Sequence, residues 1–148
     1  MKIESKIFIL SSLILLFSCS DETIANEKEP RAILIDGSGT YSREISTTVE
    51  RSQNFFDQGL RFAWGFYFPE SIASYQEAAR LDPIHPMPHW GMAHAMGPNP
   101  NSRYARMPDD PQGEGLKAIK RALERIENAN PIEKNSFGQC MFFMIKKL

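Results

Sequence analysis

Residues 52–83 read SQNFFDQGLRFAWGFYFPESIASYQEAARLDP. In the first half of this stretch, aromatic or small residues recur every three or four positions: Phe55, Gly59, Phe62 and Phe66. That spacing places them on one face of a helix. Pro69 then fits the first turn of a second helix, and Asp82-Pro83 ends it. The stretch predicts two consecutive helices, which is the beginning of an all-α fold.

The flanking sequence extends this pattern. Thr47 and Glu50 have the spacing of a capping box, which predicts that the first helix begins near Thr47. The second helix has an apolar face made of Ile72, Tyr75, Ala78 and Ala79. A third helix is predicted from Pro88 to Met96, with Trp90 and Ala93 facing inward. The chain is therefore expected to continue as a series of helices.

A fourth helix has a clear start, with Asp110 as its cap and Pro111 as its first residue. One face of it carries four large apolar residues: Leu116, Ile119, Leu123 and Ile126. The segment Asn130–Lys134 is typical of the start of another helix. Residues 97–110 form a long loop between the third and fourth helices.

Residues 52–85 resemble one tetratricopeptide repeat. The matching positions carry the expected aromatic, small and proline residues: Phe55, Gly59, Phe62, Tyr75, Ala78 and Pro83. Two positions depart from the pattern, Gln58 where leucine is usual and Ser71 where alanine is usual. The resemblance implies antiparallel helical hairpins over residues 46–134, an α-α superhelix in which Trp90 also packs. A generic pair of helices is the alternative interpretation.

The sequence from Ala78 to Asn99 also resembles a bacterial subfamily of larger tetratricopeptide proteins. Its members often carry two cysteines just before the tryptophan, but His85 and Pro88 stand at those positions here. No redox or metal role is therefore carried over. Two hairpins are fewer than the about three that stacked repeats usually need, and residues 135–148 are apolar on nearly all sides. We therefore expect an N-terminal fragment of a longer protein, truncated or frame-shifted.

The first residues predict where the protein is located in the cell. A short apolar run ends at Leu16-Phe17-Ser18-Cys19, which resembles the lipobox of bacterial lipoproteins. The resemblance implies that residues 1–18 are a signal peptide and that lipid on Cys19 anchors the protein in the cell envelope, more to the outer than the inner membrane. An ordinary secretory signal is the alternative. Residues 19–45 are then expected to be a flexible leader.

The composition argues against nucleic acid as a partner and against a fold held by a disulfide. Without residues 1–18 the formal charge is −2, from 17 − 2 basic and 18 − 1 acidic groups. This balance does not favour nucleic acid as a partner. Cys140 is the only cysteine besides Cys19, so once Cys19 carries lipid no disulfide can form within the chain. The fold must be held by apolar packing or by a partner.

The sequence contains no motif that predicts catalysis or a cofactor. His85 and His89 are four residues apart, but Pro86 and Pro88 prevent the shared helix that a metal site of this spacing needs, and His94 falls on another side. In the long loop, Arg103, Tyr104 and Arg106 are candidate contacts with a partner.

We therefore expect a lipid-anchored tetratricopeptide scaffold, not an enzyme, that binds a protein or peptide partner on its concave face. The alternative is an accessory helical region of a larger envelope enzyme or metal-binding protein.

Overall fold

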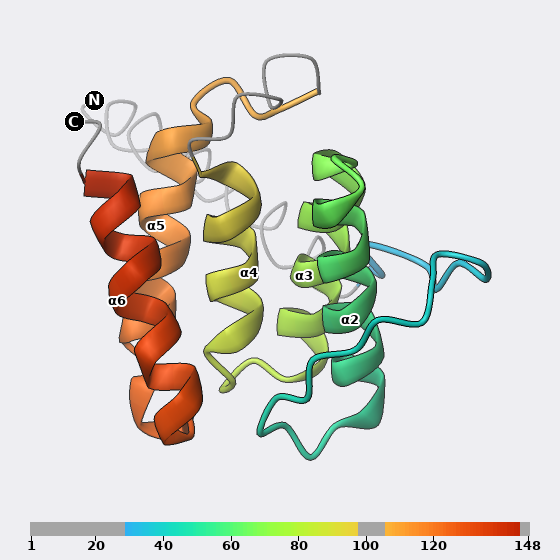
Figure 1. Ribbon diagram of the computed structural model, residues 1–148, viewed down its shortest axis with the longest axis horizontal. Coiled ribbons are helices and arrows are strands. Elements are labelled where there is room, and N and C mark those ends of the chain that lie inside the picture. Colours follow the sequence, from blue (N-terminus) through green and yellow to red (C-terminus); the bar gives the residue numbers. More distant parts are fainter. Residues whose placement is uncertain (1–28, 98–105, 146–148) are drawn as a thin grey trace, which may run out of the picture.

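The computed structural model describes residues 29–97 and 106–145, and Cys19, Arg103 and Tyr104 lie outside this part. The described chain forms five α-helices and one short 3-10 helix (Figure 1). The elements are α2 (Glu50–Trp64), α3 (Phe68–Leu81), α4 (Met87–Met96), α5 (Pro111–Leu123), η2 (Ile126–Asn128) and α6 (Pro131–Ile145). The predicted all-α class is confirmed.

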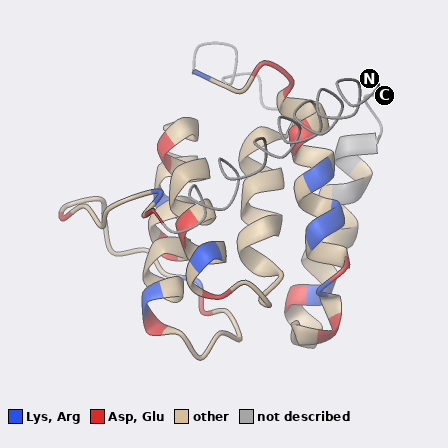
Figure 2. Ribbon diagram, turned by 180° about the vertical axis from the view of Figure 1, so that it is seen from behind, with Lys and Arg blue, Asp and Glu red and all other residues tan. Residues whose placement is uncertain are grey.

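The helices pack in sequential, antiparallel pairs and form two layers. In Figure 1, α2, α4 and α6 stand side by side in front, with α3 and α5 behind them. α4 is the central element, because it packs against each of the other four helices. It contains no Lys, Arg, Asp or Glu, as the uniformly tan ribbon in Figure 2 illustrates, and nine of its residues are buried. A helix that is apolar on all sides belongs in the middle of a domain.

The close packing of α2, α3 and α4 depends on one aromatic ring. Tyr75 of α3 is fully buried and lies against Gly59 of α2 and Gly91 of α4. Neither glycine has room for a side chain, because an added Cβ would collide with the Tyr75 ring. Phe56 packs against the same ring, with the two centroids 5.5 Å apart. The small and aromatic residues of the sequence pattern thus meet in the core.

The predicted capping box at Thr47 is wrong. α2 begins at Glu50, and Val49 precedes it without a side-chain cap. Thr47 instead accepts a hydrogen bond from the N–H of Val49 and donates one to Asp82 at the end of α3. Its hydroxyl is therefore used between elements and not within α2.

Phe66 is not on the inner face of α2, contrary to the prediction. α2 ends at Trp64, and Phe66 lies beyond it with φ of 64° and a half-exposed ring. The N–H of Phe66 bonds to the carbonyl of Ala63, and the N–H of Tyr67 bonds to that of Phe62. This pair of bonds is a Schellman motif, in which glycine usually occupies the position of Phe66.

The inner face of α5 is made mainly of small residues. Asp110 caps the helix as predicted by accepting from the N–H of Gly113. The buried residues of α5, however, are Gly115, Ala118, Ile119 and Ala122. Of the four large apolar residues expected inside, only Ile119 is buried, while Leu116, Leu123 and Ile126 are partly exposed. Small residues let α5 approach α4 closely.

The start of α6 is fixed by a reciprocal cap. Asn130 Oδ1 accepts from the N–H groups of Ile132 and Glu133, and Glu133 Oε2 accepts from the N–H of Asn130. Such a pair satisfies N–H groups that the first turn of a helix leaves unbonded. In residues 29–97 and 106–145, no helix has the length and hydropathy that crossing a membrane requires.

Candidate functional site

The segment before α2 runs from α3 along α2 to the start of α6, with a turn at residues 36–38 between its two halves, and we call residues 31–46 the strap. Its first contact is the N–H of Arg31 to Glu77 of α3, at 2.8 Å. Its last is the N–H of Ser46 to Glu133 of α6, at 2.7 Å. This segment falls mostly within the leader that we expected to be flexible. Its backbone is bonded to side chains of α2, α3 and α6.

The second half of the strap runs antiparallel to α2 and pairs with it in a regular register. Side chains on one stripe of α2 bind the main chain of every second strap residue. The three pairs are Arg61 Nη1 to the Tyr41 carbonyl, the Arg43 N–H to Asp57 Oδ1, and the Ile45 N–H to Gln53 Oε1, each at 2.9 Å. We call Gln53, Asp57 and Arg61 the α2 stripe.

This register has a geometric cause. Four residues of an α-helix rise about 6 Å, and two residues of an extended chain advance about 6.6 Å. Side chains four apart on a helix therefore keep step with alternate residues of an extended chain. Because these three bonds go to main-chain groups, they depend on extended conformation and not on side-chain identity.

Gln58 holds the first half of the strap in the same manner. Its Oε1 accepts from the N–H of Ile35 at 2.7 Å, and its Nε2 donates to the carbonyl of Ile33 at 2.9 Å and to Ser74 Oγ at 3.0 Å. A leucine could make none of these bonds. The departure of Gln58 from the repeat pattern therefore has a structural reason, because its amide binds the strap. Ser71, the other departure, donates to the Gly59 carbonyl at 2.8 Å.

One strap side chain reaches across the front layer. The guanidinium of Arg43 lies 5.1 Å from the centroid of the Trp90 ring on α4. It also donates to Ser136 Oγ on α6 at 2.8 Å. The Trp90 indole N–H donates to the Ser136 carbonyl at 3.0 Å, and His94 stacks on Trp90 with centroids 5.2 Å apart. Trp90 therefore forms a platform for a cation, held in place by α6.

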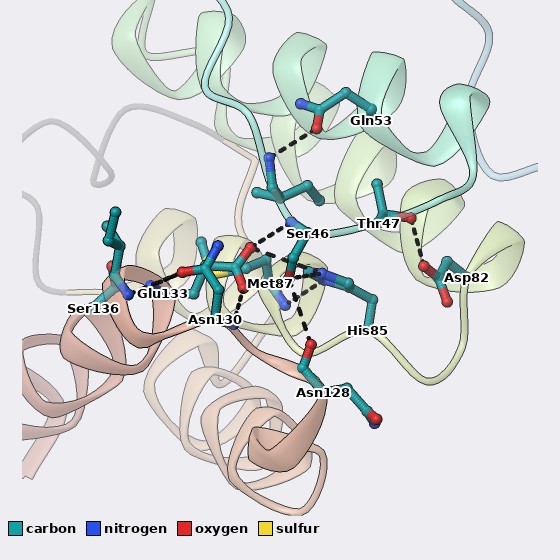
Figure 3. A network of polar contacts seen from close by, with 12 residues as sticks. Ser46, Thr47, Gln53, Asp82, His85, Met87, Asn128, Asn130, Glu133 and Ser136 are labelled. Atoms are coloured by element: carbon teal, nitrogen blue, oxygen red, sulfur yellow. Dashed lines mark hydrogen bonds and ion pairs between the residues drawn. The ribbon is translucent and has the colours of Figure 1, made fainter.

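The end of the strap is anchored at the bottom of the helix layer, where Figure 3 draws Ser46 among Glu133, His85 and Asn128. Ser46 Oγ donates to Glu133 Oε2 at 2.6 Å and lies 3.1 Å from His85 Nε2. The N–H of Met87 donates to His85 Nδ1 at 3.3 Å. Burial lowers the pKa of His85, against the opposing effect of Glu133.

The direction of each hydrogen bond in this cluster decides whether Ser46 and His85 can act as a nucleophile and its base. Ser46 gives its proton to Glu133, so His85 Nε2 must carry a proton and donate to Ser46. His85 Nδ1 already accepts a backbone N–H. Neither ring nitrogen can then take the Ser46 proton, which a nucleophile and base pair would require. The cluster of Ser46, His85 and Glu133 is an anchor for the strap.

The other two histidines lie apart from this cluster. His89 is buried, and its Nδ1 has no hydrogen-bond partner among the residues that the structure describes. Burial, together with Arg125 and Arg121, lowers the pKa of His89 to about 4. His94 is exposed beside Trp90. Within the described residues, no three His, Cys, Asp or Glu side chains are arranged to hold a metal ion. Burial also raises the pKa of the Cys140 thiol to about 11.

Most of the residues predicted to pack within the repeat are buried. Phe55, Gly59, Tyr75, Ala78 and Trp90 are buried, Phe62 is half-buried and Pro83 is exposed. Arg106, the one described member of the loop trio, is exposed. The sequence predicted Trp90 as a packing residue, but it did not predict the roles of Arg43, Ser136 or the α2 stripe around it.

A polar hollow of about 250 Å³ lies between strap residues 34–39 and α2. Its volume is below the range of about 300–1,000 Å³ that is typical of small-molecule pockets. Asp36, Asn54 and Arg61 are among its polar lining residues. It does not supply the apolar enclosure that a small organic ligand needs.

Comparisons of the chain with protein-family models, with curated proteins and with solved structures found no match. Its class is therefore defined by the described fold, a domain of five packed helices with the strap bonded to α2, α3 and α6.

Proposed function

We propose that this chain is a tetratricopeptide-type scaffold that binds an extended polypeptide on the face formed by α2, α4 and α6. The observation that carries the proposal is the register between the α2 stripe and the strap. A face that holds one extended backbone through Gln53, Asp57 and Arg61 has the chemistry to hold another. The buried contact of Gly59 and Gly91 with Tyr75 supports the repeat-like packing.

The proposal includes a lipid anchor at Cys19 and a location in the cell envelope, at the outer membrane. This part rests on the lipobox-like sequence alone. Growth with labelled palmitate should label the chain, and Cys19→Ser should remove the label. A labelled Cys19→Ser protein, or an unlabelled parent, contradicts the anchor without affecting the binding face.

The binding proposal is tested with the full chain carrying Arg43→Pro. Proline has no N–H for Asp57 and no guanidinium for Trp90 and Ser136, so the substitution removes three strap contacts. The purified variant is incubated with envelope extract, and bound polypeptides are identified by mass spectrometry. The matched control adds Asp57→Ala, which damages the α2 stripe.

We expect a small set of polypeptides that the Arg43→Pro chain retains and the double variant loses. Equal capture by both chains would show that binding does not use this face. No capture by a chain whose circular dichroism remains helical would also contradict the proposal.

A further inference from the structure

Trp90 and Ser136 together form a site suited to an arginine side chain, and we call this pair the arginine seat. The Trp90 ring supplies a flat electron-rich face for the guanidinium, and Ser136 Oγ accepts one of its N–H groups at 2.8 Å. Ser136 also fixes the ring, because its carbonyl accepts the indole N–H at 3.0 Å. The seat joins α4 and α6 and is occupied by a residue of the strap.

The seat is in register with the α2 stripe. Asp57 Oδ1 accepts the main-chain N–H of the same Arg43 whose side chain fills the seat. Asp57 Oδ2 accepts the hydroxyl of Ser42 at 2.6 Å. An extended chain bound in this register therefore presents one side chain to the seat and the preceding one to Asp57. The arginine seat and Asp57 therefore recognise two adjacent residues of the bound chain by their side chains.

We propose, building on the proposed function, that the partner carries a serine-arginine pair in an extended segment and that the strap is its intramolecular competitor. Arginine suits the seat better than lysine, because a planar guanidinium can stack on Trp90 and donate to Ser136 at once. Arg43 holds the seat until a partner segment with the same pair displaces it.

The tether sets how strongly the strap competes. A segment joined to its own site acts at an effective concentration in the millimolar range. A short free peptide should therefore bind the intact chain weakly. Weakening the strap without altering the helices should uncover the site for such a peptide.

The test uses a fluorescein-labelled peptide with the sequence of residues 39–46, GTYSREIS, and the full chain. Binding is followed by fluorescence anisotropy for the parent chain and for Arg43→Pro. We expect the variant to bind the peptide at least about tenfold more tightly than the parent, because the tethered competitor is weakened. The control peptide GTYSAEIS lacks the arginine side chain and should bind the variant about tenfold more weakly, since it loses the stack and the hydrogen bond.

The outcomes separate the two proposals. If Arg43→Pro binds both peptides equally, the arginine seat is wrong and the binding face remains. If the variant keeps its helical circular dichroism and binds neither peptide, both proposals fail. If the parent binds GTYSREIS as tightly as the variant does, the strap is not a competitor.

A second measurement covers the case in which Arg43→Pro does not fold. Ser136→Ala removes the hydroxyl acceptor of the seat and keeps the carbonyl that holds Trp90. Trypsin cleavage after Arg43, measured by mass spectrometry, should be several-fold faster in this variant than in the parent. Cleavage after exposed Arg121 is the internal control and should not change. An unchanged rate after Arg43 would overturn the arginine seat.

Discussion

The ring of Tyr75 fills the space that a side chain on residue 59 would need, since a Cβ added to Gly59 would lie 2.7 Å from Tyr75 Cε1. Gly59 belongs to α2 and Tyr75 to α3. The two helices can approach as they do only because one of the meeting residues has no side chain. On the other side, Gly91 lets α4 approach the same ring.

Gly59→Ala should therefore destabilise the domain, although alanine favours helix more than glycine does. We expect a loss of roughly 1–3 kcal/mol in the free energy of unfolding, because overpacking a full core forces its neighbours to move. Urea denaturation followed by circular dichroism measures it. Gly138→Ala in α6 is the matched control, since no atom of the described part of the chain lies within 4 Å of its added Cβ. It should raise stability by up to about 1 kcal/mol, and equal effects at both sites would contradict this account.

Phe66→Gly should stabilise the turn between α2 and α3. The left-handed conformation at φ of 64° costs a residue with a side chain roughly 1–2 kcal/mol, and glycine avoids this cost. The ring is half-exposed, and the variant loses its contact with Phe68, whose ring centroid lies 6.2 Å away. Phe66→Ala removes the ring but keeps the strain. Thermal unfolding should rank the glycine variant above the alanine variant, and the reverse order would show that the ring matters more than the backbone.

Gln58→Leu restores the residue that the repeat pattern expects and should release the first half of the strap. Leucine cannot bind the N–H of Ile35 or the carbonyl of Ile33. Amide hydrogen exchange at Ile35 should become faster by about fivefold to tenfold, as the loss of a hydrogen bond of about 1–1.5 kcal/mol implies. The amide of Phe56, inside α2, is the internal control. Unchanged exchange at Ile35 would mean that other contacts hold the strap.

The stability of the domain should fall as the pH is lowered from about 6.5 towards 4. His89 has a pKa of about 4 in the folded protein, chiefly because of burial, whereas an exposed histidine has a pKa of about 6.5. The unfolded chain thus takes up a proton before the folded chain does. The stability that neutral His89 contributes is complete above pH 6.5 and is lost as the pH approaches the folded pKa.

The size of this effect is on the order of 3 kcal/mol for the whole interval. His89→Leu removes the titrating group and should flatten the dependence of the unfolding free energy on pH between 6.5 and 4.5. His85 will leave a residual slope, because burial lowers its pKa as well. Urea denaturation at several pH values provides the comparison. Parallel curves for the parent and the variant would show that His89 is accessible to protons in the folded state.

Much of the helix order was predictable from sequence, because prolines and periodic apolar residues are local signals. Pro69, Pro111 and Pro131 each lie in the first turn of a helix. Helix ends set by side chains from elsewhere were not predictable. Thr47 resembles a cap, yet its hydroxyl bonds to Asp82, which lies 35 residues further along the chain. The large apolar residues of α5 resemble a core stripe, yet alanines make the close contact.

The strap could not be read from composition or periodicity. Its contacts join backbone groups to side chains on α2, α3 and α6, and such pairs leave no repeating pattern in the sequence. The arginine seat and its occupant bring together residues 43, 90 and 136, which no local motif connects. Gln58 was the exception, since an amide in place of a buried leucine must find hydrogen-bond partners.

The central position of α4 determines how cooperatively the domain unfolds. In a linear stack of repeats, an outer unit can detach and leave its neighbours standing. Here α4 packs against the other four helices, and nine of its ten residues are buried. If α2 and α3, or α5 and α6, detached, this uncharged helix would be exposed to water. The five helices should therefore unfold together, in one transition.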